Sequence, residues 1–231
     1  MLIVKTLVAF LSLAGLGRPA LAAAPAVSAE QAVKKVQSYY SATQKLKADF
    51  RQEYTNATFG RTSNSDGVLW IAKPGKMRWD YKTPTIKYFI SDGTTLWVYD
   101  QPSRQAFQQS LKDQILPVAV TFLFGQGNLT EEFHAELDPG KYGGKNDVCV
   151  KLTPKKPEAQ YKNLWLVIDA SDFHVKESVI LEASDNINHF SFFNVKTNDE
   201  VKKLDAKHFT FVPPPGTRLI KTEGGQIVPG E

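Results

Sequence analysis

The stretch GVLWIAKPGKMRWDY, residues 67–81, decides the fold class of this chain. Its first part, 67–72, is apolar on both faces, and Lys-Pro-Gly at 73–75 has the composition of a tight turn. After the turn, apolar and polar side chains alternate from Met77 to Tyr81 with the period of two that a strand requires. The stretch therefore predicts two antiparallel strands joined by a short turn.

The same pattern continues on both sides of this stretch. One amphipathic helix is predicted over residues 28–45, with Ser28 as its N-cap and Gln31 as the capping-box partner. About ten or eleven short strands at close intervals predict an antiparallel meander and not strand–helix–strand units. The other predicted strands are 46–54, 86–90, 96–99, 104–109, 132–137, 148–153, 164–169, 175–182 and 187–195.

Composition excludes several classes of protein. The 231 residues contain 28 Lys and Arg against 24 Asp and Glu, which is too small a bias to indicate a nucleic-acid-binding surface. The single cysteine, Cys149, cannot form an intramolecular disulfide, and its place in a strand predicts a packed structural thiol. No linker or repeat divides the chain, so residues 23–216 are predicted to form one domain and 217–231 a polar tail.

Residues 1–22 are predicted to be a cleaved secretory signal peptide. Lys5 precedes an apolar run, 6–16, which is too short to span a bilayer. The small-residue motif Ala20-x-Ala22 follows it as the cleavage site. The sequence therefore predicts an exported protein without a transmembrane helix.

Motifs for catalysis or metal binding are missing from the sequence. It has no G-x-S-x-G nucleophile elbow and no H-E-x-x-H motif, and its four histidines have no ligand-like spacing. Gly125 and Gly127 lack the third glycine of a phosphate loop and are interpreted as a helix end. We therefore expect no enzyme, no catalytic residue, no metal and no cofactor.

Three segments carry more apolar residues than a sheet with one solvent-exposed face needs. Residues 69–71 and 164–168 are apolar on both strand faces, so both faces are covered by protein or one lines an apolar cavity. The segment Val118–Phe124 is apolar all round, as expected of a core helix or of a helix that touches an apolar ligand. Together they suggest a curved sheet and a helical lid that share one apolar space.

Four segments in order, 46–52, 67–79, 91–99 and 205–214, resemble the LolA family of periplasmic outer-membrane lipoprotein carriers. The resemblance extends over residues 28–217. It implies a mainly β fold with α: an open, curved antiparallel β half-barrel covered by an α-helical lid. The concave side of such a fold receives the acyl chains of lipoproteins.

The resemblance also implies partners. Members of the family accept lipoproteins from the inner-membrane ABC transporter LolCDE and deliver them to the outer-membrane receptor LolB, where that receptor exists. They act as monomeric carriers in the periplasm, without a cofactor. We therefore expect this chain to be a periplasmic monomer that carries lipoproteins.

The site residues implied by the resemblance fall into three groups. Lys73 matches the basic residue that latches the lid by hydrogen bonds, whereas Arg78 points to the other face of its strand. The predicted acyl-chain cavity is lined by Phe50, Trp70, Met77, Trp79 and Trp97. The predicted lid comprises Ile115, Leu116, Val120, Phe122 and Leu123.

Other functions fit the same pattern. LolA-like periplasmic regulators that resemble RseB or MucB sense lipoproteins, but they carry a second domain for which this chain leaves no room. A carrier of another lipid would share the fold and the apolar cavity. A lipid hydrolase would need a nucleophile and histidine pair that the sequence does not contain.

The signal-peptide assignment predicts a defined mature terminus. Expression of the full sequence in a Gram-negative host should give a protein that begins at Ala23, because signal peptidase recognises the small residues at 20 and 22. Intact-mass measurement of the purified protein checks this. A mass that still includes Met1 would contradict it.

Overall fold

The computed structural model describes residues 27–111, 127–201, 204–223 and 226–229. Within them, one 13-stranded sheet runs in the order β13-β12-β6-β5-β4-β3-β2-β1-β11-β10-β9-β8-β7. The first meander comprises β1 (Lys45–Asn56), β2 (Arg61–Ala72), β3 (Lys76–Thr83), β4 (Lys87–Asp92), β5 (Thr95–Asp100) and β6 (Gln105–Ser110). The second comprises β7 (Phe133–Leu137), β8 (Asp147–Pro154), β9 (Tyr161–Asp169), β10 (Val175–Glu182) and β11 (Ile187–Thr197). The remaining elements are α1 (Ala29–Ala42), α3 (Leu129–Glu132), η3 (Asn198–Glu200), η4 (Ala206–Phe209), β12 (Arg218–Glu223) and β13 (Gln226–Pro229).

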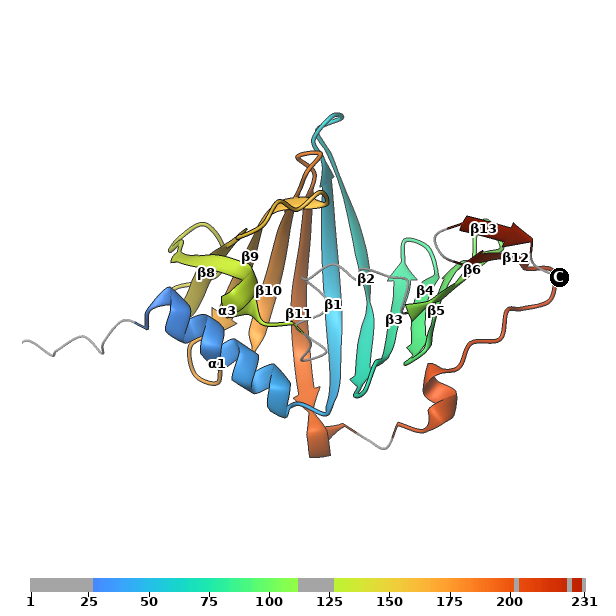
Figure 1. Cartoon of the computed structure of the whole chain (residues 1–231), viewed down its shortest axis with the longest axis horizontal. Coiled ribbons are helices and arrows are strands. Elements are labelled where there is room, and N and C mark those ends of the chain that lie inside the picture. The colour runs from blue at the N-terminus through green and yellow to red at the C-terminus, as the bar shows by residue number, and fades with distance from the viewer. Residues whose placement is uncertain (1–26, 112–126, 202–203, 224–225, 230–231) are drawn as a thin grey trace, which may run out of the picture.

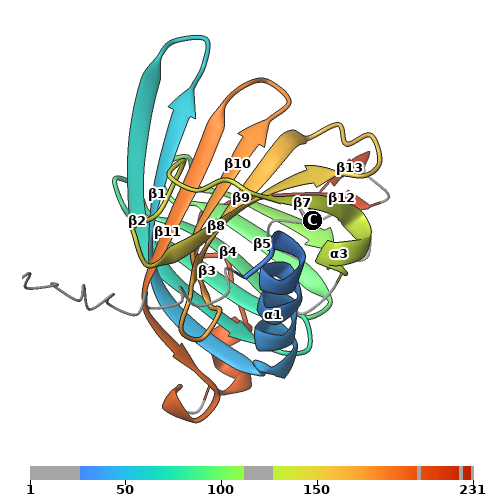
Figure 2. The ribbon, with the colours of Figure 1, turned by 90° about the vertical axis from the view of Figure 1, so that its left-hand side faces the viewer.

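The two meanders join because β1 pairs with β11, the last strand of the second meander. The pairs around this junction are all antiparallel, and the sheet curves strongly around α1 (Figures 1 and 2). The predicted open, curved antiparallel sheet is therefore confirmed. The strands that the sequence predicted recur with shifted ends, and the largest shift is in β2, which begins at Arg61 instead of Gly67.

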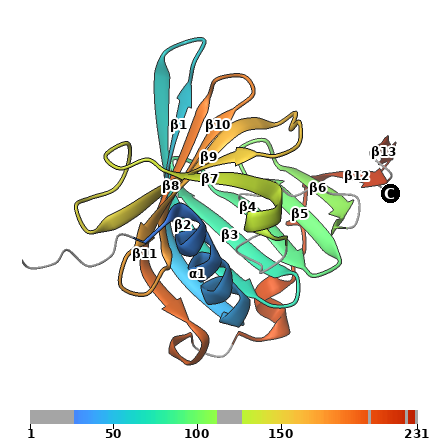
Figure 3. The same cartoon turned by 60° about the vertical axis from the view of Figure 1, so that its left-hand side comes forward.

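Helix α1 lies across the concave face of the sheet; its start is as the sequence predicts, but it ends at Ala42 and not at Lys45, where β1 begins. The side chain of Ser28 accepts a hydrogen bond from Gln31 N, and the Gln31 side chain accepts one from Ser28 N, which completes the capping box. Val33, Val36 and Tyr40 are buried on one face of the helix, in the main apolar core. The helix packs against α3, β7 and β8, as Figure 3 shows.

The C-terminal segment 204–216 covers part of the opposite, convex face. The ring of His208 packs on Trp70 with 4.9 Å between centroids, and Phe211 packs on Trp97 with 5.6 Å between centroids. Figure 1 shows this segment passing beside β3–β5 on its way to β12. This segment therefore covers the apolar side chains Trp70 of β2 and Trp97 of β5 on the convex face.

The end of the chain differs from the sequence prediction. Residues 217–231 were expected to form a polar tail, but the described part contains β12 and β13. Strand β12 pairs in parallel with β6 and antiparallel with β13, so it extends the sheet at one edge. The prediction was wrong because backbone hydrogen bonds can add an edge strand without the apolar pattern on which sequence reasoning depends.

Gly67 allows the closest contact in the curved sheet. It lies directly opposite Phe50 on β1 and Tyr81 on β3, and the Phe50 ring crosses over it to Tyr81 at 4.9 Å between centroids. A Cβ at Gly67 would lie 2.2 Å from the Asp80 carbonyl oxygen and 2.5 Å from Phe50 Cζ. Glycine is therefore required here for close approach.

This contact predicts a large effect of one methyl group. Gly67→Ala should lower the free energy of unfolding by about 2–3 kcal/mol, because both Phe50 and the β3 backbone must shift. Gly144→Ala is the matched control, since a Cβ there meets only Asp147 Oδ2 at 3.5 Å. Denaturant unfolding of both variants checks this. Equal stability of the two variants would contradict it.

Candidate functional site

Six aromatic side chains form one continuous surface on the concave face. They come from β1, β3, β4 and β11, and we call them the aromatic wall: Phe50, Trp79, Tyr81, Phe89, Phe190 and Phe192. Phe50 and Trp79 are buried, whereas the other four are half-buried. The wall therefore has a buried base and a partly open surface.

Strand register brings these rings together. Trp79 lies opposite Phe89 and Phe50 lies opposite Phe192, so each pair shares a face. The rings of Phe190 and Phe192 stack with 6.2 Å between centroids and 7° between planes. Trp79 contacts Phe190 at 5.4 Å, which closes the gap between β3 and β11.

The six side chains of the aromatic wall carry no charge, and at their margin the Lys87 ammonium lies over the Phe89 ring, 5.3 Å from its centroid. Burial raises the pKa of the Tyr81 hydroxyl, so this side chain stays neutral at physiological pH. Figure 1 shows α1 in front of β8–β11 and beside the half of the concave face that β2–β5 form. A partly open, neutral aromatic surface is suited to binding apolar chains, because apolar surface gains free energy when it leaves water.

The structure divides the predicted cavity residues between the two faces. Phe50, Met77 and Trp79 lie together in the core on the concave face. Trp70 and Trp97 lie on the convex face under His208 and Phe211, so their assignment to the cavity was wrong. Period-two alternation is the reason, because one step along a strand reverses the face of a side chain.

Sequence reasoning missed Tyr81, Phe89, Phe190 and Phe192. Tyr81 is in phase with Trp79 along β3, so its face could have been found from alternation alone. The other three depend on which strands are neighbours. Strands β1 and β11 are far apart in the sequence, and only the tertiary structure shows that they pair.

Lys73 holds the C-terminal end of α1. Its Nζ donates a hydrogen bond to the backbone carbonyl of Tyr40, one of the last carbonyls of the helix. Partial burial lowers the pKa of Lys73. The predicted latch thus contacts α1, whereas the lid segment 115–124 lies outside the described residues and its contacts with Lys73 are not tested.

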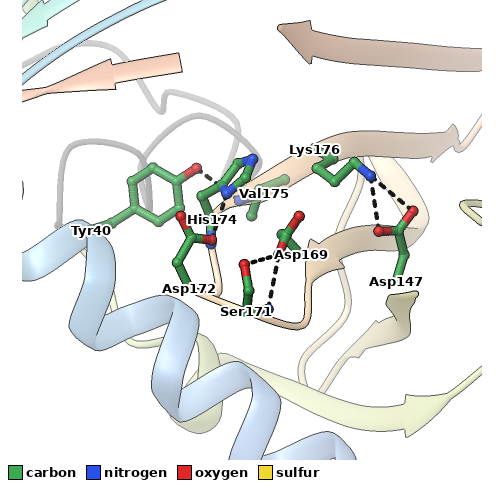
Figure 4. A network of polar contacts seen from close by, with 8 residues as sticks. All are labelled: Tyr40, Asp147, Asp169, Ser171, Asp172, His174, Val175 and Lys176. Carbon is green, nitrogen blue, oxygen red and sulfur yellow. Dashed lines mark hydrogen bonds and ion pairs between the residues drawn. The ribbon is translucent and has the colours of Figure 1, made fainter. Parts of the chain in front are cut away.

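A second contact fixes the same helix end. The Tyr40 hydroxyl accepts a hydrogen bond from the Val175 N–H at 3.2 Å, as Figure 4 shows. Burial raises the pKa of Tyr40, which keeps the hydroxyl protonated. The last turn of α1 is therefore tied to the end of β2 through Lys73 and to β10 through Val175.

The surroundings of the remaining candidate groups indicate a structural role. Cys149 is buried with Trp165, Val167 and Val179 in a small convex-face core, and burial raises the pKa of its thiol. This confirms the predicted packed thiol. Among the described residues, no three His, Cys, Asp or Glu side chains are arranged to hold a metal ion. No helix in the described ranges is long and apolar enough to span a membrane.

Arg78 also lies where the sequence predicts. It sits on the convex face, pairs with Asp80 at 2.8 Å, and donates to the His208 carbonyl at 3.1 Å. It therefore holds the C-terminal segment against the sheet and does not approach the concave site.

Comparison with known proteins agrees with this geometry. Residues 41–212 match the model of the family "Outer membrane lipoprotein carrier protein LolA". The outer-membrane lipoprotein carrier protein of Alkalilimnicola ehrlichii is 29% identical over 206 residues, covering 87% of this chain and 90% of the relative. That of Chromobacterium violaceum is 27% identical over 207 residues, covering 90% and 92%. A conserved protein of solved structure from Thermus thermophilus shares the fold at 9% identity, with a TM-score of 0.53 over 84% of this chain and 99% of that one. The chain belongs to the LolA family of outer membrane lipoprotein carrier proteins.

Proposed function

We propose that this protein is a periplasmic carrier that binds the acyl chains of lipoproteins on its aromatic wall and delivers them to the outer membrane. The observation that carries the proposal is the continuous set of uncharged aromatic rings on the concave face, in which Tyr81, Phe89, Phe190 and Phe192 are only half-buried. Family membership supports the lipoprotein as cargo.

The physical need for such a surface is large. Each CH₂ group exposed to water costs about 0.8 kcal/mol, so a sixteen-carbon acyl chain costs roughly 12 kcal/mol. A lipoprotein cannot cross an aqueous compartment with its chains exposed. Rings that are only partly buried in the protein can cover these chains, and no catalytic group is needed for this task.

The direction of transport follows from the family. The carrier takes its cargo from the inner-membrane transporter LolCDE and passes it to the receptor LolB, if that receptor is present. The apolar segment with Ile115, Leu116, Val120, Phe122 and Leu123 acts as the lid in this proposal. Cargo chains displace the lid, which lowers net affinity and permits release.

Neighbouring residues of β4 provide a test of the binding face. Phe89→Asp should weaken binding of a fluorescent fatty-acid probe at least about tenfold, because a carboxylate beside an acyl chain costs roughly 1.4 kcal/mol or more. Tyr88→Asp is the control, since Tyr88 is also half-buried but lies on the convex face against Tyr99. Fluorescence titration of both variants measures this. Equal affinity would place the acyl chains elsewhere.

Lys73 provides a test of the latch. Lys73→Leu should reduce the rate of cargo transfer to the receptor, because α1 loses its bond through the Tyr40 carbonyl. The free energy of unfolding should fall by only about 1 kcal/mol, since the ammonium is partly exposed. Lys73→Arg, which keeps the donor, is the control. A normal transfer rate for Lys73→Leu would show that Lys73 is no latch.

A further inference from the structure

Strand β11 extends past its neighbour on one side. The ladder between β10 and β11 ends where Glu177 lies opposite Ser191, whereas the ladder with β1 continues to Thr197 opposite Leu46. Figure 2 shows β11 continuing past the end of β10. Residues 192–197 therefore have one strand edge without a sheet neighbour among the described residues. Such an edge is a template for another extended chain.

A cavity of about 460 Å³ lies against this edge, and we call it the edge slot. Phe192 and Phe193 both line it, although consecutive strand residues point to opposite faces. The strand is irregular here, because Asn194 has a φ of +51° and the register with β1 shifts. The slot therefore reaches past the edge of β11 from the concave side to the outside. Its lining is Tyr39, Asp172, His174, Lys176, Phe192, Phe193, Asn194, Val195, Thr197 and Glu200.

The wall opposite β11 is held by hydrogen bonds. In the turn between β9 and β10, His174 Nδ1 lies 2.6 Å from Asp172 Oδ1 (Figure 4). At the start of β10, Lys176 Nζ donates to Asp147 Oδ1 at 2.9 Å. These contacts hold the side chains that face β11 across the slot, beside the register shift of β10 between Val175 and Glu177.

The edge slot joins an apolar floor to a polar rim. Phe192 belongs to both the slot and the aromatic wall, where it stacks on Phe190. On the rim, Tyr39 and Thr197 both line the slot, and burial together with the nearby Asp172 carboxylate raises the pKa of Tyr39. A ligand in the slot can thus be apolar at its inner end and polar at its outer end.

We infer that the edge slot binds an extended polypeptide as an added strand on β11, and that this polypeptide is the segment of the lipoprotein that follows its acylated residue. The inference rests on the proposed function, because a carrier that encloses acyl chains must let the hydrophilic polypeptide attached to them leave. The slot begins at Phe192, which also belongs to the aromatic wall that is proposed to hold such chains. Pairing with backbone groups is independent of side-chain identity, which suits a carrier of many cargoes.

A chemical change in the peptide tests the strand pairing. The probes are a diacylated cysteine peptide with a six-residue polar tail, the same lipopeptide with N-methylated tail amides, and the diacylated cysteine alone. The tail should raise affinity about tenfold over the diacylated cysteine, and N-methylation should abolish this gain, because methylated amides cannot donate to β11. Equal affinity of the methylated and unmethylated lipopeptides would overturn the inference. Failure of all three to bind would instead overturn the proposed function.

Cross-linking locates the peptide tail. A benzophenone side chain in place of Phe193, which is 42% exposed and lines the slot, should form an adduct with the tail of the bound lipopeptide. The control is the same group in place of Phe59, which is 74% exposed at the β1–β2 turn. Adducts at 59 and not at 193 would overturn the inference, as would adducts at 193 that join two carrier molecules without lipopeptide.

Discussion

Apolar side chains occupy both faces of β2 and β9, and this constraint requires a cover on each side of the sheet. On the convex face, η4 and Phe211 lie over Trp70 and Trp97. On the concave face, α1 packs over the half formed by the second meander. Tyr81, Phe89, Phe190 and Phe192 stay half-buried, and this incomplete cover leaves the apolar surface on which the proposed function depends.

The last turn of α1 connects the parts of the site. Tyr40 accepts hydrogen bonds from Lys73 at its carbonyl and from Val175 at its hydroxyl. The adjacent Tyr39 lines the edge slot together with Thr197. This turn therefore contacts both the apolar core on the concave face, through Tyr40, and the slot, through Tyr39.

Alternation of side chains along single strands allowed the face of several site residues to be predicted from the sequence. Met77 and Trp79 were assigned to one face and Arg78 to the other, and the structure agrees. The cavity list failed where it combined strands, since Trp70 and Trp97 are out of phase with the concave residues. Whether residues on two neighbouring strands share a face depends on how the two strands are aligned. This alignment is set by contacts with distant parts of the chain, which the local sequence pattern does not contain.

The sequence by itself determined the helix cap at Ser28, the strand periodicity, the family and the absence of a disulfide, because these depend on neighbouring residues or on composition. Only the tertiary structure decided the pairing of β1 with β11, the ring of Phe50 over Gly67 and the slot beside Phe192. These features arise where segments from different parts of the chain meet or where a ladder stops short. The free energy that selects them comes from packing and from backbone hydrogen bonds between strands, which no local pattern records.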